Sequence, residues 1–552
     1  MGCPARPDVE WTDESARALQ RIGFNAVQLN IAWGPRPADE PLNLEDVVEL
    51  PEAEAREYPQ PVPLRCDPSP ERRERRRADL RLRIAVARQA GLRTIFHFGA
   101  PFNAHESYGD NPPNCLQDPK VVRRYELLIE TLNGEFPGID DLLLYTYDQD
   151  AWLCSEFGTC PRCVGAPLHG RVAGFVNALA AAWRRLNPNG RLWWEPWELS
   201  AGQALRAAEL LDASCVGLSL HSNIAEVQAA IPVDRWLELT VRMAKSRGIP
   251  VIVEHFLSSP TEEMEPFTHI GYPLVTLRSL RKIAGVGADG IKEYYGIVPS
   301  ASDANLAMTA AFLADPSVSD EEALRRLSAS YGDAAASMPE FWRLQSAAME
   351  LFPWYTSWFI REVGRSGPAH SMRAAFIRGQ QAHTPSWEST RRAIFMKTDE
   401  SPPDPWMLED VQLQCEMSAA RMAEALRVGE SIRDLIPEGI RDDFAAGLEE
   451  MEAWRRITLS YALHIRETNL TRILRRHLAS GSPLPDRVLH ELKETLTADI
   501  ANQGEEEPCR SALSLLESDP EKFAQSLFCD ADPAEVLGGW RWSGSIFSVT
   551  SR

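Results

Sequence analysis

Carboxylates recur at the ends of short apolar segments in this sequence. One such segment, LLLYTYD at 142–148, ends in an aspartate, and a second aspartate follows two residues later. Charged side chains are rarely buried unless they are paired or functional. Two neighbouring carboxyl groups can cleave a glycosidic bond, because one protonates the leaving oxygen while the other acts as nucleophile or as base toward a water. The candidate carboxylates are Asp148, Asp150, Glu195, Glu254 and Glu293.

Aromatic and hydrogen-bonding side chains stand near the same segment ends. Aromatic rings offer flat apolar faces that can pack on the C–H side of a sugar ring, and histidine and asparagine can hold hydroxyl groups by hydrogen bonds. Any one residue of this set could instead be structural, as a paired acid, a core tryptophan or a core histidine. We expect substrate binding by Glu195, His97, Asn30, Trp33, Trp152, Trp194, His221, His255 and Tyr295.

Three cysteines follow the aspartate pair in the pattern Cys154-x5-Cys160-x2-Cys163. Thiolates at this spacing can wrap one structural Zn²⁺ ion if a fourth ligand comes from elsewhere in the chain. A disulfide, or ordinary thiols in an ordered loop, are the alternatives. In each case the cysteines would brace the loop that carries Asp150 rather than perform the reaction. The candidates for the fourth ligand are His169, Cys115 and Cys66.

Eight apolar segments that alternate with amphipathic helical stretches must position these residues. Such alternation predicts an α/β fold in which helices cover a parallel sheet. Eight units predict that residues 1–300 form a (β/α)8 TIM barrel. In such a barrel the chemistry lies at the carboxyl ends of the strands. An open doubly wound sheet is the alternative, but the first strand lacks the Gly-rich phosphate turn of that fold. The predicted strands are 25–33, 93–100, 114–118, 142–148, 191–198, 215–222, 250–256 and 289–296.

Helical periodicity replaces the strand pattern from about residue 301. We therefore predict an α-helical domain over residues 301–552, in which the tail at 538–551 is extended. The segment 365–405 has no clear period and could be a loop that reaches the barrel mouth.

Bulk properties exclude some partners. The formal net charge of -21 argues against nucleic acid, whose phosphates require clustered lysine and arginine. No apolar run reaches the ~20 residues that span a bilayer, so we expect no membrane partner. The first residues, MGCPARPD, lack an apolar signal core, and we interpret the ten cysteines mostly as reduced thiols of a cytoplasmic protein.

Several stretches together resemble the barrels of family 20 β-hexosaminidases and family 67 α-glucuronidases. They are GFNAVQLN at 23–30, AGLRTIFHF at 90–98, DPKVVRRY at 118–125 and FPGIDDLLLYTYDQD at 136–150. The sequence looks closest to uncharacterised barrels related to these families, in which an acid at the strand end precedes a cysteine cluster. The helical stretch 301–335 resembles theirs as well.

The resemblance implies roles for some of the carboxylates. In the hexosaminidases the matching strand ends in an Asp-Glu pair whose Glu is the acid, but the matching positions here are Asp148 and Gln149, and a glutamine cannot donate a proton. The distance to the first cysteine favours Asp150 as the acid. Related retaining barrels place the nucleophile at the end of strand seven, which implies Glu254, with Glu293 as its competitor.

These patterns predict a glycoside hydrolase that acts on a small oligosaccharide or glycoside and needs no cofactor for catalysis. The alternatives are a non-catalytic carbohydrate-binding barrel and a metal-dependent hydrolase that uses His97, His221 and His255. The number of carboxylates favours hydrolysis, because binding alone does not require several acids. No H-x-H or H-E-x-x-H spacing supports the metal-dependent alternative. The sugar, the anomer and formation of a homo-oligomer remain open.

Overall fold

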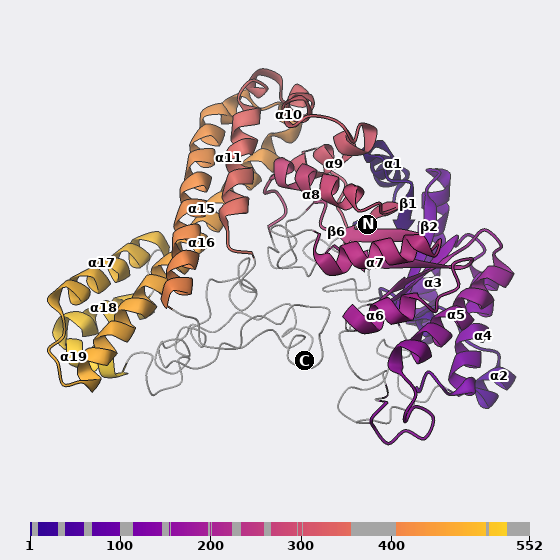
Figure 1. Cartoon of the computed structure of the whole chain (residues 1–552). Helices are drawn as coiled ribbons and strands as arrows, with labels where there is room; N and C mark the ends of the chain where they lie inside the picture. The colour runs from indigo at the N-terminus through magenta and orange to yellow at the C-terminus, as the bar shows by residue number, and fades with distance from the viewer. Residues whose placement is uncertain are drawn as a thin grey trace.

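A parallel sheet of seven strands, in the order β1 to β7, forms the centre of the computed structural model (Figure 1). Each neighbouring pair is parallel. The strands are β1 (Ala26–Gln28), β2 (Arg93–Gly99), β3 (Asp141–Tyr145), β4 (Leu192–Glu195), β5 (Val216–His221), β6 (Val251–His255) and β7 (Gly290–Glu293). The structure describes residues 1–2, 9–30, 39–59, 69–99, 114–145, 154, 156–196, 199, 201–222, 233–258, 267–294, 296–300, 302–354, 405–503 and 507–526.

The prediction of a strand at 114–118 is wrong. These residues form a turn that enters helix α4 (Pro119–Glu135). The Asp118 side chain accepts a hydrogen bond from the Lys120 N–H at 2.9 Å, and Pro119 is the first helical residue. An aspartate followed by proline favours the start of a helix. This preference outweighs the weak strand signal of the two apolar residues, Cys115 and Leu116. The predicted strands four to eight are therefore β3 to β7.

The ladder of strands does not close between β7 and β1 in the part of the chain that the structure describes. The two edge strands instead line a common cavity, with Val27 on one side and Ile291 on the other. Met1 also lines this cavity, and Gly2 donates its N–H to the Ile297 carbonyl oxygen at 2.8 Å. The fold is thus TIM-like, and the described residues form seven hydrogen-bonded strands where eight were predicted.

Helices cover the outside of the sheet (Figure 1). Strands β3 and β5 are buried along their whole length, which explains their near-continuous apolar sequences. At the amino ends of the strands, Arg93 holds the Asp141 carboxylate by two hydrogen bonds of 2.6 and 2.8 Å, which helps to fix the register of β2 on β3. Besides α4, the helices are α1 (Asp13–Ile22), α2 (Glu52–Glu57), α3 (Pro70–Gln89), α5 (Leu168–Leu186), α6 (Ala201–Ala208), α7 (Arg235–Ser246) and α8 (Pro273–Gly285).

The described residues after Glu293 contain helices and no strand, as the sequence predicts for this half. In Figure 1, α11, α15 and α16 run together away from the sheet, and α17 to α19 lie at the far end of this bundle. Residues 355–404 and the predicted tail lie outside the described residues. The helices are α9 (Ala304–Ala314), α10 (Asp320–Ser328), α11 (Met338–Leu351), α15 (Pro405–Ile432), α16 (Arg441–Ala479), α17 (Asp486–Gln503), α18 (Glu507–Ser518) and α19 (Pro520–Ser526).

One apolar core joins the sheet side to the helical half. It runs from Leu19 in α1 through Leu280 in α8 and Phe312 in α9 to Trp454 in α16. A second core fills the space between the sheet and helices α3 to α7, and a small third core holds α17 to α19 against the end of α16. Packing is therefore continuous across residue 300, and the domain boundary predicted there stays a prediction.

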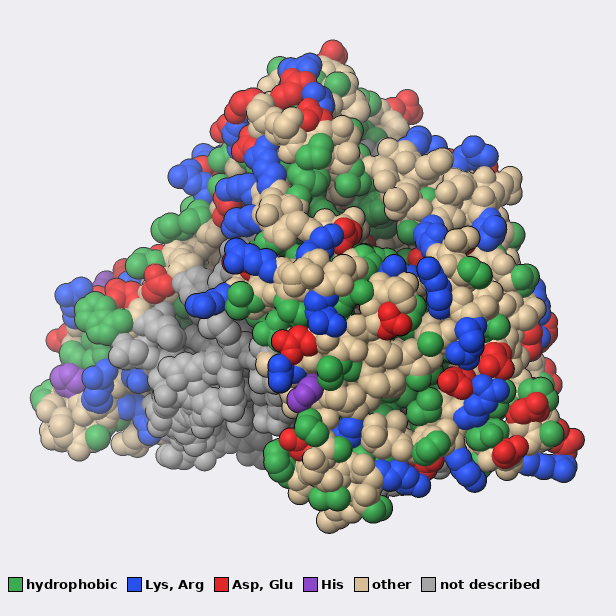
Figure 2. Space-filling view, turned by 45° about the vertical axis from the view of Figure 1, so that its right-hand side comes forward, with side chains coloured by type: hydrophobic (Ala, Val, Ile, Leu, Met, Phe, Trp, Pro, Cys, Tyr) green, Lys and Arg blue, Asp and Glu red, His purple; other side chains and the backbone are tan. Residues whose placement is uncertain are grey.

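Charges of both signs are interspersed on the face seen in Figure 2, without a basic stripe. No described helix combines the length and the apolar character needed to cross a membrane.

Candidate active site at the carboxyl ends of the strands

Glu195, His221 and Glu254 meet at the carboxyl ends of β4, β5 and β6. The strands are neighbours in the sheet, and His221 pairs in register with Glu254. One side-chain oxygen or nitrogen atom of each residue lies within 4.8 Å of those of the other two, and all three residues are buried. Parallel strands end at the same edge of a sheet, so their last side chains converge although they are far apart in sequence.

Hydrogen bonds and one lysine hold this cluster together. His221 Nε2 donates to Glu195 Oε1 at 2.6 Å and lies 4.0 Å from Glu254 Oε2. The other oxygen of Glu254, Oε1, accepts a hydrogen bond from the Ser219 hydroxyl and lies 3.2 Å from Lys292 Nζ. Glu254 Oε2 makes no hydrogen bond to any residue that the structure describes. One oxygen of Glu254 is thus held by hydrogen bonding and charge, while no described residue donates a hydrogen bond to the other.

The charges around Glu254 act in opposite directions on its carboxyl group. Burial raises its pKa, and the nearby Glu195 carboxylate raises it further. Lys292 and His221, and the hydrogen bond from Ser219, lower it. The pKa of Glu254 stays above its ordinary value, so Lys292, His221 and Ser219 offset the effects of burial and Glu195 only in part.

Sequence reasoning did not include Ser219 and Lys292 among the site residues. The sequence does mark both, because each is a polar residue within an apolar strand. Ser219 also stands two residues before His221, so the two side chains lie on the same face of the strand. The register places Lys292 directly beside Glu254. That pairing joins β6 to β7, and the sequence alone did not show it.

His255 and Glu293 lie beside the cluster of Glu195, His221 and Glu254, at the ends of β6 and β7. The His255 ring nitrogen Nδ1 forms a hydrogen bond of 2.9 Å with the Ser222 hydroxyl, and burial lowers the pKa of His255 to about 3, so this histidine is neutral. Glu293 pairs with His255 in register, and its Oε2 accepts the Leu257 N–H at 2.7 Å. Both residues hold neighbouring chain segments at the edge of the site.

Asn30 and His97 link the ends of β1 and β2. Asn30 donates to the His97 carbonyl at 2.7 Å and to the Pro41 carbonyl at 3.0 Å, and its Oδ1 accepts the His97 N–H at 2.9 Å. The side-chain amide of Asn30 thus forms hydrogen bonds with backbone groups, whereas we expected it to bind substrate. Gln28 Nε2 donates to His97 Nδ1 at 3.1 Å, and the His97 ring packs edge-on against Tyr145 with centroids 5.5 Å apart.

Trp194, which we expected to bind substrate, lies away from Glu195 in the structure. Its side chain is fully buried in the core between the sheet and helices α3 to α7. Successive residues of a strand point to opposite faces, so Trp194 lies on the face opposite to that of Glu195. Trp193, which shares its face with Glu195, is partly exposed and contacts Gly217 of β5.

Five predicted site residues lie outside the described residues, so the structure does not place the proposed acid. They are Trp33, Asp148, Asp150, Trp152 and Tyr295.

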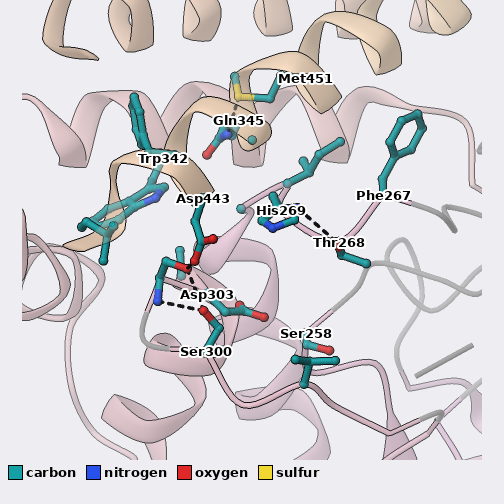
Figure 3. A pocket seen from close by; sticks show the side chains of 18 of the residues that line it. Ser258, Phe267, Thr268, His269, Ser300, Asp303, Trp342, Gln345, Asp443 and Met451 are labelled. Atoms are coloured by element: carbon teal, nitrogen blue, oxygen red, sulfur yellow. Dashed lines mark hydrogen bonds between the residues drawn. The ribbon is translucent and has the colours of Figure 1, made fainter. Parts of the chain in front are cut away.

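A cavity between the end of the sheet and the helical half adjoins the site (Figure 3). Glu293 lines it, together with Asp303, Asp443 and Trp342. Asp303 begins α9 by accepting hydrogen bonds from two backbone N–H groups, at 2.8 and 2.9 Å, but its burial raises the pKa of the carboxyl group to about 7. Asp443 of α16 accepts a hydrogen bond from Ser302. Sequence reasoning missed this cavity because its walls come from segments more than 100 residues apart.

No protein-family model and no curated protein sequence matches the chain. Solved structures do resemble it. A GH138 enzyme targeting pectin rhamnogalacturonan II has a TM-score of 0.60 at 11% identity, over 89% of this chain and 71% of that one. A mutant O-GlcNAc hydrolase from Thermobaculum terrenum has a TM-score of 0.39 at 11% identity, over 94% of both chains.

The likeness to the GH138 enzyme shows that this chain shares the fold of that enzyme. At 11% identity it concerns the fold alone. The finer resemblance to families 20 and 67 stays a prediction.

Proposed function

We propose that this chain is a glycoside hydrolase that cleaves the glycosidic bond of a small oligosaccharide or glycoside with carboxyl groups at the ends of its strands. The buried cluster of Glu195, His221 and Glu254 carries this proposal. Burying two carboxylates this close together is costly, and a core without catalytic function would gain more from apolar side chains. The fold shared with a glycoside hydrolase supports it.

Glu254 is the proposed nucleophile. Ser219 and Lys292 hold Oε1 and favour the ionised carboxylate, which leaves Oε2 to attack the anomeric carbon. Glu195, oriented by the hydrogen bond from His221, would bind a sugar hydroxyl beside it. We assign the acid to Asp150 or, failing that, to Asp148, on the loop that follows β3. Glu293 is the alternative partner should Glu254 prove dispensable.

The reaction sequence follows from these roles. The acid gives its proton to the leaving oxygen while Oε2 of Glu254 bonds to the anomeric carbon, and the acid then removes a proton from the water that releases the sugar. The anomeric configuration is retained, because two displacements occur at the same carbon. We expect a carbohydrate as partner, no cofactor in catalysis and a cytoplasmic location.

The proposal is tested by a screen with aryl glycosides and natural oligosaccharides, followed by variants on the first substrate that turns over. Glu254→Gln and Asp150→Asn should each lower kcat on the natural substrate by roughly 10²–10⁴-fold. Glu238→Gln, on the exposed face of α7, is the matched control and should keep wild-type activity. Retention is read by NMR from the first-formed anomer.

Azide separates the two roles when an activated aryl glycoside is used. With Glu254→Gly, azide should restore turnover and yield a glycosyl azide of inverted configuration, because it replaces the nucleophile. With Asp150→Ala, an activated leaving group should reduce the defect, because such a group departs with little protonation. Full activity of both variants on the natural substrate would refute the assignment, and binding without turnover would favour a carbohydrate-binding barrel.

A metal-dependent hydrolase is the second candidate, since Glu195, His221 and Glu254 could together hold a metal ion. The Lys292 ammonium group, 3.2 Å from Glu254, already supplies a positive charge there and disfavours a cation. We therefore expect equal metal content in the wild type and in Glu195→Gln. A metal lost specifically in Glu195→Gln, together with the activity, would establish the second candidate instead.

A further inference from the structure

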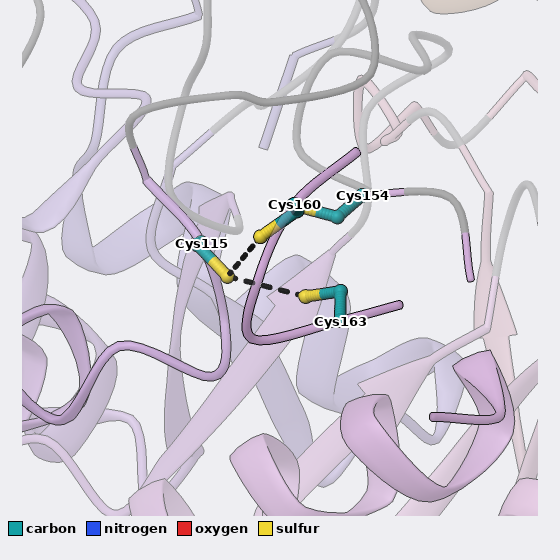
Figure 4. A group of neighbouring side chains, drawn as sticks. All are labelled: Cys115, Cys154, Cys160 and Cys163. Atoms are coloured by element: carbon teal, nitrogen blue, oxygen red, sulfur yellow. Dashed lines mark hydrogen bonds between the residues drawn. The ribbon is translucent and has the colours of Figure 1, made fainter. Parts of the chain in front are cut away.

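Four cysteines from two separate segments meet in one buried cluster (Figure 4). Cys115 precedes α4, whereas Cys154, Cys160 and Cys163 lie between β3 and α5. The four sulfur atoms all lie within 4.8 Å of one another. Cys115 Sγ is 3.3 Å from Cys163 Sγ and 3.9 Å from Cys160 Sγ. Each side chain is at most 2% exposed.

We propose that these four cysteines bind one structural Zn²⁺ ion. Zinc takes four ligands at the corners of a tetrahedron, with Zn–S distances of about 2.3 Å, which places neighbouring sulfur atoms about 3.8 Å apart. The distances from Cys115 Sγ to the sulfur atoms of Cys163 and Cys160, 3.3 and 3.9 Å, lie on either side of this value. They exceed the ~2.0 Å of a disulfide bond, and the cysteines are free. Four thiolates also fill the coordination shell, as in structural rather than catalytic sites.

The backbone around Cys160 and Cys163 is shaped for such a site. Cys163 and Val164 both donate N–H groups to the Cys160 carbonyl, at 3.1 and 2.9 Å, which folds the C-x2-C segment into a tight turn. Gly165 follows at a φ of +73°, a conformation that favours glycine, and donates its N–H to the Glu156 carbonyl at 2.8 Å. This turn directs both sulfur atoms to one side.

The fourth ligand, Cys115, is held by its own contacts. Asp118 donates its N–H to the Cys115 carbonyl at 2.9 Å, and the Asp118 carboxylate forms an ion pair of 3.0 Å with Arg162 of the C-x2-C turn. The buried Arg171 donates to the Cys154 carbonyl at 2.7 Å and brings positive charge to the site. Four thiolates on one Zn²⁺ carry two net negative charges, which this guanidinium would offset in part.

The zinc ion would join two loops at the carboxyl end of the sheet. One loop follows β2, and the other follows β3 and carries Asp150, four residues before Cys154. The ion would therefore anchor the chain beside the proposed acid. This consequence rests on the proposed function, but the metal site itself does not.

Metal analysis of the purified full-length protein tests the site without an activity assay. We expect one zinc per chain. A mercurial reagent that blocks thiols should release this zinc from the wild-type protein in proportion to the thiols blocked. A chromogenic chelator measures the zinc that is released. After replacement by Co²⁺, the protein should show the intense visible absorption of a tetrahedral thiolate site.

Variants assign the ligands. Cys115→Ser and Cys160→Ser should each lose most of the zinc, whereas Cys160→His should retain it, because histidine is also a zinc ligand. Cys215→Ser and Cys415→Ser are matched controls, since both cysteines are buried and lie outside the cluster, and they should retain one zinc per chain. Circular dichroism and gel filtration show whether each variant is folded.

Iron in place of zinc, disulfide-linked cysteines, or four free thiols that fail to take up added Zn²⁺ would each overturn the proposal. So would full zinc content in folded Cys115→Ser. An enzyme without glycosidase activity that still carries one thiol-bound zinc would refute the proposed function and leave the metal site standing.

Discussion

At the scale of single residues, the ionisation of Glu254 depends on its neighbours. Burial and Glu195 favour the protonated carboxyl group, whereas Lys292, His221 and Ser219 favour the carboxylate. A nucleophile must be ionised to react. The balance between these neighbours should therefore set the lower pH limit of activity.

We predict that Lys292→Met shifts this limit upward. Lys292 lowers the pKa of Glu254, so its loss raises that pKa, and a higher pH is then needed to ionise the carboxyl group. The acidic limb of kcat/KM against pH, which reports the free enzyme, should move to higher pH, and activity at neutral pH should fall.

Lys245→Met is the control for this experiment. Lys245 pairs with Asp289 near the surface, at the opposite end of the strands, so its loss should leave the pH profile unchanged. An unchanged acidic limb in Lys292→Met would mean that Glu254 does not act as the ionised group.

At the scale of the elements, strand alternation separates residues that are adjacent in sequence. In β4, Glu195 belongs to the site, whereas Trp194 belongs to the core behind the sheet. Large aromatic side chains contribute strongly to such cores. The two positions should therefore respond differently to substitution.

We predict that Trp194→Ala lowers the free energy of unfolding by about 3–5 kcal/mol, because it leaves a cavity in a fully buried core. The folded fraction should keep the KM of the wild type. Urea denaturation measures the first effect, and steady-state kinetics below the unfolding transition measures the second.

Glu195→Gln provides the opposite pattern as a comparison. It should lose activity, while its urea midpoint should change less than that of Trp194→Ala. A Trp194→Ala protein of wild-type stability, or one with a strongly raised KM, would place this side chain at the substrate instead.

At the scale of the whole molecule, the sheet and the helical half share a core and enclose the cavity that Asp303 lines. Asp303 is partly buried where these parts meet, and desolvation there raises the pKa of its carboxyl group from 3.8 to about 7. Between about pH 4 and pH 7 the Asp303 carboxyl group is therefore protonated in the folded chain and ionised in the unfolded chain. Stability from this group is complete below pH 4 and is lost as the pH rises toward 7.

We predict that Asp303→Asn reduces this loss. Asparagine keeps the oxygen that caps α9 but has no charge to bury, so the difference in unfolding free energy between pH 5 and pH 8 should become smaller. At about 1.4 kcal/mol per pKa unit, the change amounts to a few kcal/mol at most. Urea denaturation at the two pH values measures it.

Asp315→Asn is the control, because Asp315 is exposed at the other end of α9 and its pKa is lowered by hydrogen bonds to Ser317. It should not reduce the fall in stability above pH 5. If Asp303→Asn behaves like this control, the carboxyl group of Asp303 is already ionised in the folded protein.

The sequence by itself determined the local elements of this protein. Apolar segments between amphipathic stretches predicted the strands of the sheet, and uninterrupted helical periodicity predicted the helices after residue 300. The carboxylates at strand ends and the C-x2-C segment were visible for the same reason, since each is a pattern within a few residues.

Only the tertiary structure decided how distant segments meet. Pairing of β6 with β7 placed Lys292 beside Glu254, and packing of the segment before α4 placed Cys115 beside Cys154, Cys160 and Cys163. Residues 114–118 form a turn where a strand was predicted, and Trp194 packs in the core behind β4. Such contacts depend on burial and on strand register between residues far apart in the chain, which a local sequence pattern does not encode.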